Sequence, residues 1–147
     1  MFKQITVFIE NKPGRLAQVT GCLSEANINL HALSIADTSD FGICRLIVSD
    51  AEKAMAILKE KGFMTQITDV VAIATGHRPG SLHSILCELE AFDISIEYMY
   101  AFTSRVKEYD AIVILRLEGQ NAAIEKLKDS GINILGGELL ESLNKSE

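Results

Sequence analysis

The sequence lacks the long apolar segments of a membrane protein. None of its hydrophobic runs approaches the roughly 20 residues that a membrane-spanning helix needs. The first residues, MFKQITVFIEN, alternate apolar and polar side chains and contain neither the apolar core nor the cleavage site of a signal peptide. The chain is 48% hydrophobic and 23% charged, which is typical of a compact globular protein. We therefore expect a cytoplasmic protein that makes no membrane contact.

Cysteine and histidine are too few and too scattered for a disulfide framework or a metal site. The three cysteines, Cys22, Cys44 and Cys87, are widely spaced, and no CxxC occurs. The three histidines have no metal-ligand spacing relative to them. We expect all three cysteines to be buried, unreactive thiols, and we expect no metal or cofactor.

Positive charge is also in short supply. The 147 residues include 14 Lys and Arg against 20 Asp and Glu, so the formal net charge is −6, and the basic residues form no block. Affinity for a nucleic-acid backbone comes from clustered Lys and Arg. We expect no nucleic-acid partner.

Sequence signatures of catalysis are missing. There is no GxSxG, no HExxH, no glycine-rich phosphate loop, and no close Cys/His pair that suggests a nucleophile and its base. The sequence therefore predicts a protein that is not an enzyme.

What the chain does contain is an internal repeat. The segment Asn11-Lys12-Pro13-Gly14-Arg15-Leu16 resembles His77-Arg78-Pro79-Gly80-Ser81-Leu82, at an offset of 66 residues. Further on, Gly62 matches Gly131 at an offset of 69. A period this long indicates a duplicated domain rather than a solenoid. We expect one domain over 1–68, a second over 69–137, and a polar tail over 138–147 that frays.

Each copy shows the same order of elements. A strand with alternating apolar residues precedes the Pro-Gly, and a helix with an apolar stripe follows it. The rest of the first copy predicts two strands around a turn at 38–40, a helix that stops at Gly62, and a short strand at 63–67. The second copy repeats this order, beginning with a strand at 70–75. The predicted fold class is α+β, with two ferredoxin-like βαββαβ domains in tandem, antiparallel sheets, and helices on one face.

One predicted strand is apolar on both sides. Residues 111–115 read AIVIL, whereas a sheet with one bare face has polar residues on that face. We infer that the other copy or a second chain covers this face, and we expect a homodimer.

These residues resemble a known family, the ACT domain. The resemblance rests on 9–16 (IENKPGRL) followed by 26–30 (ANINL), and the second copy keeps Pro79-Gly80, Leu82 and the junction at 92–96. The first copy is especially similar to the ACT regulatory domain of D-3-phosphoglycerate dehydrogenase. The resemblance implies a non-catalytic regulatory or sensor protein. It would bind an amino acid or a related small molecule where ACT domains meet, and act in trans on a metabolic enzyme.

The resemblance also implies particular ligand-binding residues. The two asparagines of the dehydrogenase-type pattern map to Asn11 and Asn29. A histidine of that pattern is replaced by Ile9, which argues against serine as the ligand. The corresponding residues of the second copy are His77 and Ser95, so the two copies need not bind the same ligand.

The physical chemistry of the Pro-Gly loops agrees with an anionic ligand group. A helix start offers unpaired N–H donors and the positive end of the helix dipole, and an asparagine can bind either a carboxylate or an ammonium. Asn11 could instead form a local turn or cap the helix. The complete predicted site consists of Asn11, Gly14, Arg15, Leu16 and Asn29 in the first copy, and His77, Gly80, Ser81, Leu82 and Ser95 in the second.

Two other functions stay open at this point. The repeats can serve as a ligand-free module for dimerisation or for docking on an enzyme, and the apolar faces fit this function equally well. An RNA-binding domain shares the topology, and Tyr98, Tyr100 and Phe102 form an aromatic row. Such domains also need a basic surround, which this acidic chain does not have.

Overall fold

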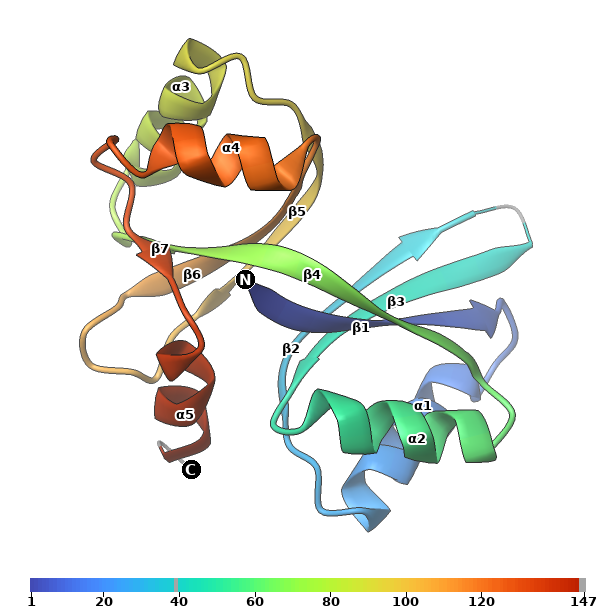
Figure 1. Ribbon diagram of the computed structural model, residues 1–147. Coiled ribbons are helices and arrows are strands. Elements are labelled where there is room, and N and C mark those ends of the chain that lie inside the picture. Colours follow the sequence, from blue (N-terminus) through green and yellow to red (C-terminus); the bar gives the residue numbers. More distant parts are fainter. Residues whose placement is uncertain (39, 146–147) are drawn as a thin grey trace. The chain divides into compact units, whose positions relative to one another are not determined.

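The computed structural model describes residues 1–38 and 40–145 (Figure 1). Ser39, within the predicted turn, and the last two residues of the predicted tail lie outside this part. The chain divides into two compact units. We call Lys3–Thr68 the N-terminal domain, and Asp69–Glu147 together with Met1–Phe2 the C-terminal domain.

The N-terminal domain has the predicted βαββαβ order. Its sheet has the strand order β2-β3-β1-β4, and β3 is antiparallel to both β1 and β2. Figure 1 shows both helices of this domain on one face of its sheet. The elements are β1 (Phe2–Glu10), α1 (Arg15–Glu25), β2 (Leu30–Asp37), β3 (Phe41–Val48), α2 (Ala51–Glu60) and the first part of β4 (Met64–Thr75).

The C-terminal domain repeats this arrangement. Its sheet has the order β7-β4-β6-β5, and all of these neighbours are antiparallel. Besides the second part of β4, its elements are α3 (Ser81–Ala91), β5 (Ile96–Thr103), β6 (Ala111–Leu117), α4 (Gln120–Leu127), β7 (Ile134–Leu135) and α5 (Glu138–Lys145).

Strand β4 is continuous, whereas the sequence predicts two separate strands at 63–67 and 70–75. The residues between them, Thr68-Asp69, include neither glycine nor proline. Nothing at this junction therefore forces the backbone out of the extended conformation. The fourth strand of the first repeat and the first strand of the second are one element.

Each domain has its own hydrophobic core between its sheet and its helices. In the N-terminal domain, Ile5, Val7 and Ile9 of β1 pack in one cluster with Val19 of α1 and Leu58 of α2. The corresponding cluster of the C-terminal domain joins β4 and β6 to α3 and α4. The two apolar periods predicted from the sequence, two for strands and between three and four for helices, therefore place the correct faces inward.

Residues 138–145 form a helix, which corrects the prediction that this part of the tail frays. In α5 the side chains of Leu139 and Leu143, four residues apart and on one face, are 2% and 5% exposed. Burial of these two leucines stabilises a short helix that its mostly polar sequence does not suggest. Figure 1 shows α5 on the side of β7 away from α4.

The other face of β6 is also buried. Ile112 and Ile114 are fully buried, as expected for a strand that is apolar on both sides. The sequence predicts that the other copy or a second chain covers this face. It does not predict helix α5, which Figure 1 shows on the side of the sheet away from α4.

Backbone details repeat from one domain to the other. The N–H of Ser49 donates to the carbonyl of Asn29 over 2.9 Å, and that of Glu118 donates to the carbonyl of Ser95 over 3.0 Å. Asn27 and Asp93, which each follow a helix, both have φ of 55°. These matches support a duplication at atomic detail.

Candidate functional site

The start of α1 and the start of α3 have the same geometry. Gly14 and Gly80 are the N-cap residues, with φ of 86° and 88° in the left-handed region that favours glycine. The N–H of Arg15 donates to the carbonyl of Lys12, and that of Ser81 donates to the carbonyl of Arg78. Each Pro-Gly is therefore a tight turn that leads directly into a helix.

Neither helix start is capped by a side chain. Gly14 and Gly80 have no side chain to accept a hydrogen bond, and the first turns of α1 and α3 contain no acidic residue. Because Gly14 is the N-cap, the alternative that Asn11 caps α1 does not hold. The helix dipoles and the N–H groups that follow those of Arg15 and Ser81 in the first turns can therefore receive an external anion.

The structure gives Asn29 a local bond. Its side-chain Oδ1 accepts a hydrogen bond from the N–H of Leu30 over 2.9 Å, and its own N–H donates to Ser49 Oγ over 3.0 Å. Asn29 thus anchors the junction of α1 and β2. A ligand that uses Oδ1 must share it with, or take it from, the Leu30 N–H.

The predicted residues of the second copy lie at its surface. His77, Leu82 and Ser95 are exposed. The His77 N–H donates to Asp110 Oδ2 over 3.4 Å, which ties the Pro-Gly loop to the end of the β5–β6 connection. Gly76 leaves room for the Ser81 hydroxyl, because a Cβ at Gly76 would lie 3.1 Å from Ser81 Oγ.

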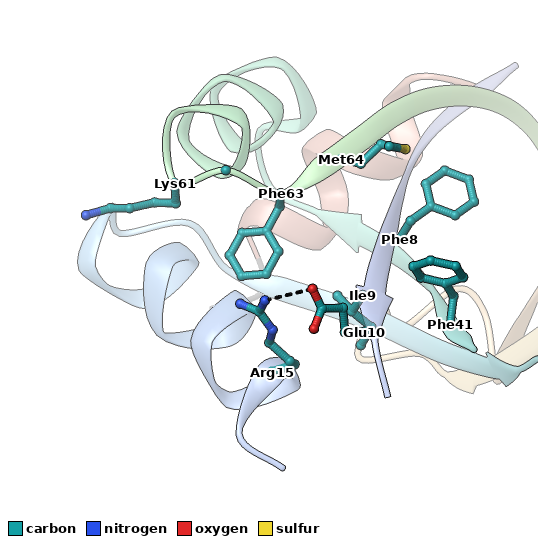
Figure 2. A pocket seen from close by; sticks show the side chains of 9 residues that line it. Phe8, Ile9, Glu10, Arg15, Phe41, Lys61, Phe63 and Met64 are labelled. Carbon is teal, nitrogen blue, oxygen red and sulfur yellow. Dashed lines mark ion pairs between the residues drawn. The ribbon is translucent and has the colours of Figure 1, made fainter. Parts of the chain in front are cut away.

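A cavity of about 410 Å³ lies at the end of β1, entirely within the N-terminal domain (Figure 2). Of the ten predicted site residues, only Arg15 lines it. The other lining residues were not predicted from the sequence, and they come from β1, β3, the turn between α2 and β4, and the first residue of β4. The lining residues are Phe8, Ile9, Glu10, Arg15, Phe41, Lys61, Gly62, Phe63 and Met64.

Charged groups converge at one side of this cavity. Arg15 Nη2 lies 3.3 Å from Glu10 Oε1, and Lys12 Nζ lies 2.8 Å from Glu10 Oε2. The Arg15 guanidinium is also 6.0 Å from the centre of the Phe63 ring, within the range of a cation–π contact. The hydrogen bond and charge of Lys12, followed by the charge of Arg15, lower the pKa of Glu10, which keeps this carboxylate ionised.

The prediction of three buried thiols is only partly right. Cys44 is fully buried, and this burial raises the pKa of its thiol to about 11. Cys22 is half-buried and Cys87 is exposed. Cys87 Sγ lies 3.5 Å from His83 Nε2, a close Cys/His pair that the spacing of four residues on a helix could have revealed.

Other kinds of site find no support in residues 1–38 and 40–145. In that range, no three His, Cys, Asp or Glu side chains are grouped so that they could hold a metal ion. Over the same residues, no helix has both the length and the apolar character needed to cross a membrane.

Comparisons with known proteins agree with the fold. Residues 1–138 match the family model described as "ACT domain pair". A solved protein from Bacteroides thetaiotaomicron is 44% identical, with a TM-score of 0.85 over 95% of this chain and 94% of that chain. The ligand-free regulatory subunit of aspartate kinase from Thermus thermophilus is 16% identical, with a TM-score of 0.60 over 88% and 91% of the respective chains, which shows the fold alone. None of the curated proteins matches the sequence.

The family match identifies the family of this chain and no narrower relationship. It covers both repeats and both Pro-Gly loops. The narrower similarity to the regulatory domain of D-3-phosphoglycerate dehydrogenase stays a prediction. The repeat, the two βαββαβ domains and the match over 1–138 together lead to one conclusion: this chain belongs to the ACT domain pair family.

Proposed function

We propose that this chain is a non-catalytic regulatory protein that binds an amino acid or a related small molecule. The observation that carries the proposal is the duplicated helix start, with a left-handed glycine and no side-chain cap at both Gly14 and Gly80. An uncapped helix start preceded by a tight turn suits the carboxylate of an amino acid.

The proposed sites keep the residues predicted from the sequence. In the N-terminal domain, the carboxylate binds at the start of α1, and the exposed Asn11 contributes its amide. Asn29 completes the site, either by sharing Oδ1 or by exchanging its bond to Leu30. In the C-terminal domain, His77 and Ser95 take the corresponding places.

Regulation in trans is part of the proposal. In this proposal, the two ACT domains control the active site of a partner enzyme. A solved chain of the same fold and similar extent is described as the regulatory subunit of an aspartate kinase, which is a precedent for a separate regulatory chain. Ligand binding regulates only if the ligand binds one arrangement of the domains more tightly than another.

A homodimer is also proposed, on the evidence of strand β2. This strand lies at the edge of its sheet, and its Leu33 and Ile35 are 37% and 44% exposed. An exposed apolar edge strand is a template for pairing with another chain. The same feature favours the second candidate function, a ligand-free module for dimerisation or enzyme docking.

Thermal melting with each of the twenty amino acids tests the proposal. A ligand that binds only the folded state raises the melting temperature, on the order of 5–10 °C at about 100 times its dissociation constant. Asn11→Ala should reduce the shift, whereas Asn121→Ala, an exposed asparagine on α4, should not. If no amino acid shifts the melting temperature, the ligand-free module becomes the better account.

A further inference from the structure

We propose that the cavity at the end of β1 binds the apolar side chain of an amino-acid ligand, with Arg15 holding the carboxylate and Glu10 the ammonium. This inference rests on the proposed function, since it assumes an amino-acid ligand. It specifies the chemical class of that ligand, an α-amino acid with a large aliphatic or aromatic side chain. It also places the site for this class of ligand in the N-terminal domain alone.

The apolar wall of the cavity contains side chains that are costly to leave in water. Phe41 is 52% exposed and Met64 is 71% exposed. Phe8 is half-buried and lies on the same sheet face as Phe41, because Phe41 pairs with Glu10 two residues along β1. Figure 2 shows the rings of Phe8 and Phe41 side by side, with Met64 near Phe8. An apolar ligand group placed there removes hydrophobic surface from water on both partners.

Arg15 and Glu10, which also line the cavity and point toward one another in Figure 2, match the two charges of an amino acid. The Arg15 guanidinium is fixed from three sides, by Glu10, by Gln18 Oε1 over 3.1 Å, and by the Phe63 ring. A guanidinium has five N–H donors, so donors remain for a carboxylate. Among the described residues that line the cavity, Glu10 is the one with an acidic side chain. Lys61 also lines the cavity, but Figure 2 shows its side chain pointing away from the rings.

The volume of the cavity and its place along the chain also support an amino-acid site. A volume of about 410 Å³ lies within the range of small-molecule sites. The loop 11–14 joins Glu10 directly to Arg15, so the proposed Pro-Gly site and the cavity adjoin along the chain. A single ligand can therefore present its charged groups to the loop and its side chain to the rings.

The second domain keeps the backbone but not the cavity residues. At the offset of 66, Phe8, Glu10 and Arg15 correspond to Ala74, Gly76 and Ser81. For the third strand of each domain the offset is 69, because Gly42 pairs with Ile9 and Ala111 pairs with Thr75. At this offset the other two phenylalanines and the methionine of the cavity are also replaced. Phe41, Phe63 and Met64 correspond to Asp110, Ile132 and Asn133. The structure therefore assigns one apolar amino-acid site to each chain, not two.

Calorimetric titration of the full chain with L-leucine, L-phenylalanine and L-alanine tests this inference. We expect leucine or phenylalanine to bind at one molecule per chain, and alanine to bind at least about tenfold more weakly because it lacks the side-chain carbons that fill the cavity. Phe41→Ala should weaken the better ligand by about tenfold. Phe102→Ala, which removes a half-buried ring from β5, is the matched control and should leave the affinity unchanged.

A second pair of variants tests the charged side of the site. Arg15→Gln should weaken binding by about tenfold or more, since a hydrogen bond to a charged group is lost. Arg105→Gln, which changes an exposed arginine of the other domain, should not. Circular dichroism of each variant verifies that it folds.

The outcomes separate this inference from the proposed function. If a polar amino acid binds best, and Asn11→Ala weakens it while Phe41→Ala does not, the sensor function stands and the apolar cavity site is wrong. Binding of leucine at two equal sites per chain would also overturn the inference. If no amino acid binds at all, both proposals fail.

Discussion

Gly14 and Gly80 hold the same left-handed backbone conformation at two points of the chain that are 66 residues apart. A Cβ at either position would meet no atom within 4 Å. The need for glycine at these positions is therefore conformational, and does not arise from crowding. It follows that alanine fits the space at both positions but strains the backbone.

Alanine substitution tests the conformation of these turns. We expect Gly14→Ala and Gly80→Ala each to lower the free energy of unfolding by about 1–2 kcal/mol, the cost of a left-handed L-residue. Gly131→Ala is the control, because Gly131 is exposed, has no positive φ and has open space around it. Urea unfolding of the three variants measures the difference. Equal effects in all three would show that the turns are not held in this conformation.

The three thiols should differ in reactivity. Alkylation requires the thiolate, and the buried Cys44, with its pKa of about 11, stays protonated at neutral pH. We expect iodoacetamide to modify the exposed Cys87 first and Cys44 only after denaturation. Mass spectrometry of the modified peptides measures the order.

The same thiol links stability to high pH. Folding raises the pKa of Cys44 from about 9 to about 11, so the folded state holds this proton more tightly than the unfolded chain. The stability that depends on it is complete below pH 9 and is lost as the pH rises through about 11. Rapid alkylation of Cys44 in the native protein at pH 7 would contradict its burial.

Sequence reasoning at this scale found the Pro-Gly loops but not the cavity. The loops have a local signature, a Pro-Gly between a strand and a helix, which can be recognised from neighbouring residues. The cavity unites Phe8, Phe41 and Met64 from three segments, and only the sheet register brings them to one place. A single phenylalanine in a strand is indistinguishable, in sequence, from a core residue.

At the scale of elements, the order of strands and helices followed from the apolar periods. The two errors both concern segments whose secondary structure depends on the packing of the folded chain. The prediction separated the halves of β4 because a domain boundary was expected there, although the junction contains no glycine or proline that would end a strand. The helix α5 depends on burial of Leu139 and Leu143, which local sequence does not reveal.

Truncation of the buried leucines tests the role of α5. We expect Leu139→Ala to lower the free energy of unfolding by about 2–5 kcal/mol, as large-to-small changes in a core do. Leu140→Ala, at the neighbouring half-buried position, should cost clearly less. Thermal and urea unfolding of both variants compare them. A loss no greater for Leu139→Ala than for Leu140→Ala would mean that α5 is not docked in solution.

At the scale of the whole molecule, one backbone design appears twice with different side chains. Both domains have the glycine turn and the uncapped helix. Only the N-terminal domain combines Arg15 and Glu10 with a ring cluster. We expect this pattern, a shared backbone with different side chains, if one domain binds the amino acid and the other binds a different ligand or has a structural role.

Assembly is predicted at the same scale. If β2 pairs with a second copy, a charge on its exposed apolar residues should weaken the pairing. We expect Ile35→Lys to shift the protein from dimer toward monomer in light scattering after size-exclusion chromatography. Lys3→Glu, an exposed substitution on β1, should not change the mass. A dimer that survives Ile35→Lys would place the contact elsewhere.

Calorimetric titration of the unmodified chain with all twenty amino acids decides whether this ACT domain pair binds an amino acid. We expect saturable binding of at least one amino acid, with an apolar one the tightest and one molecule bound per chain. Absence of binding across the whole panel, by a protein that is folded, would contradict the claim and leave the Pro-Gly loops as turns that only begin helices.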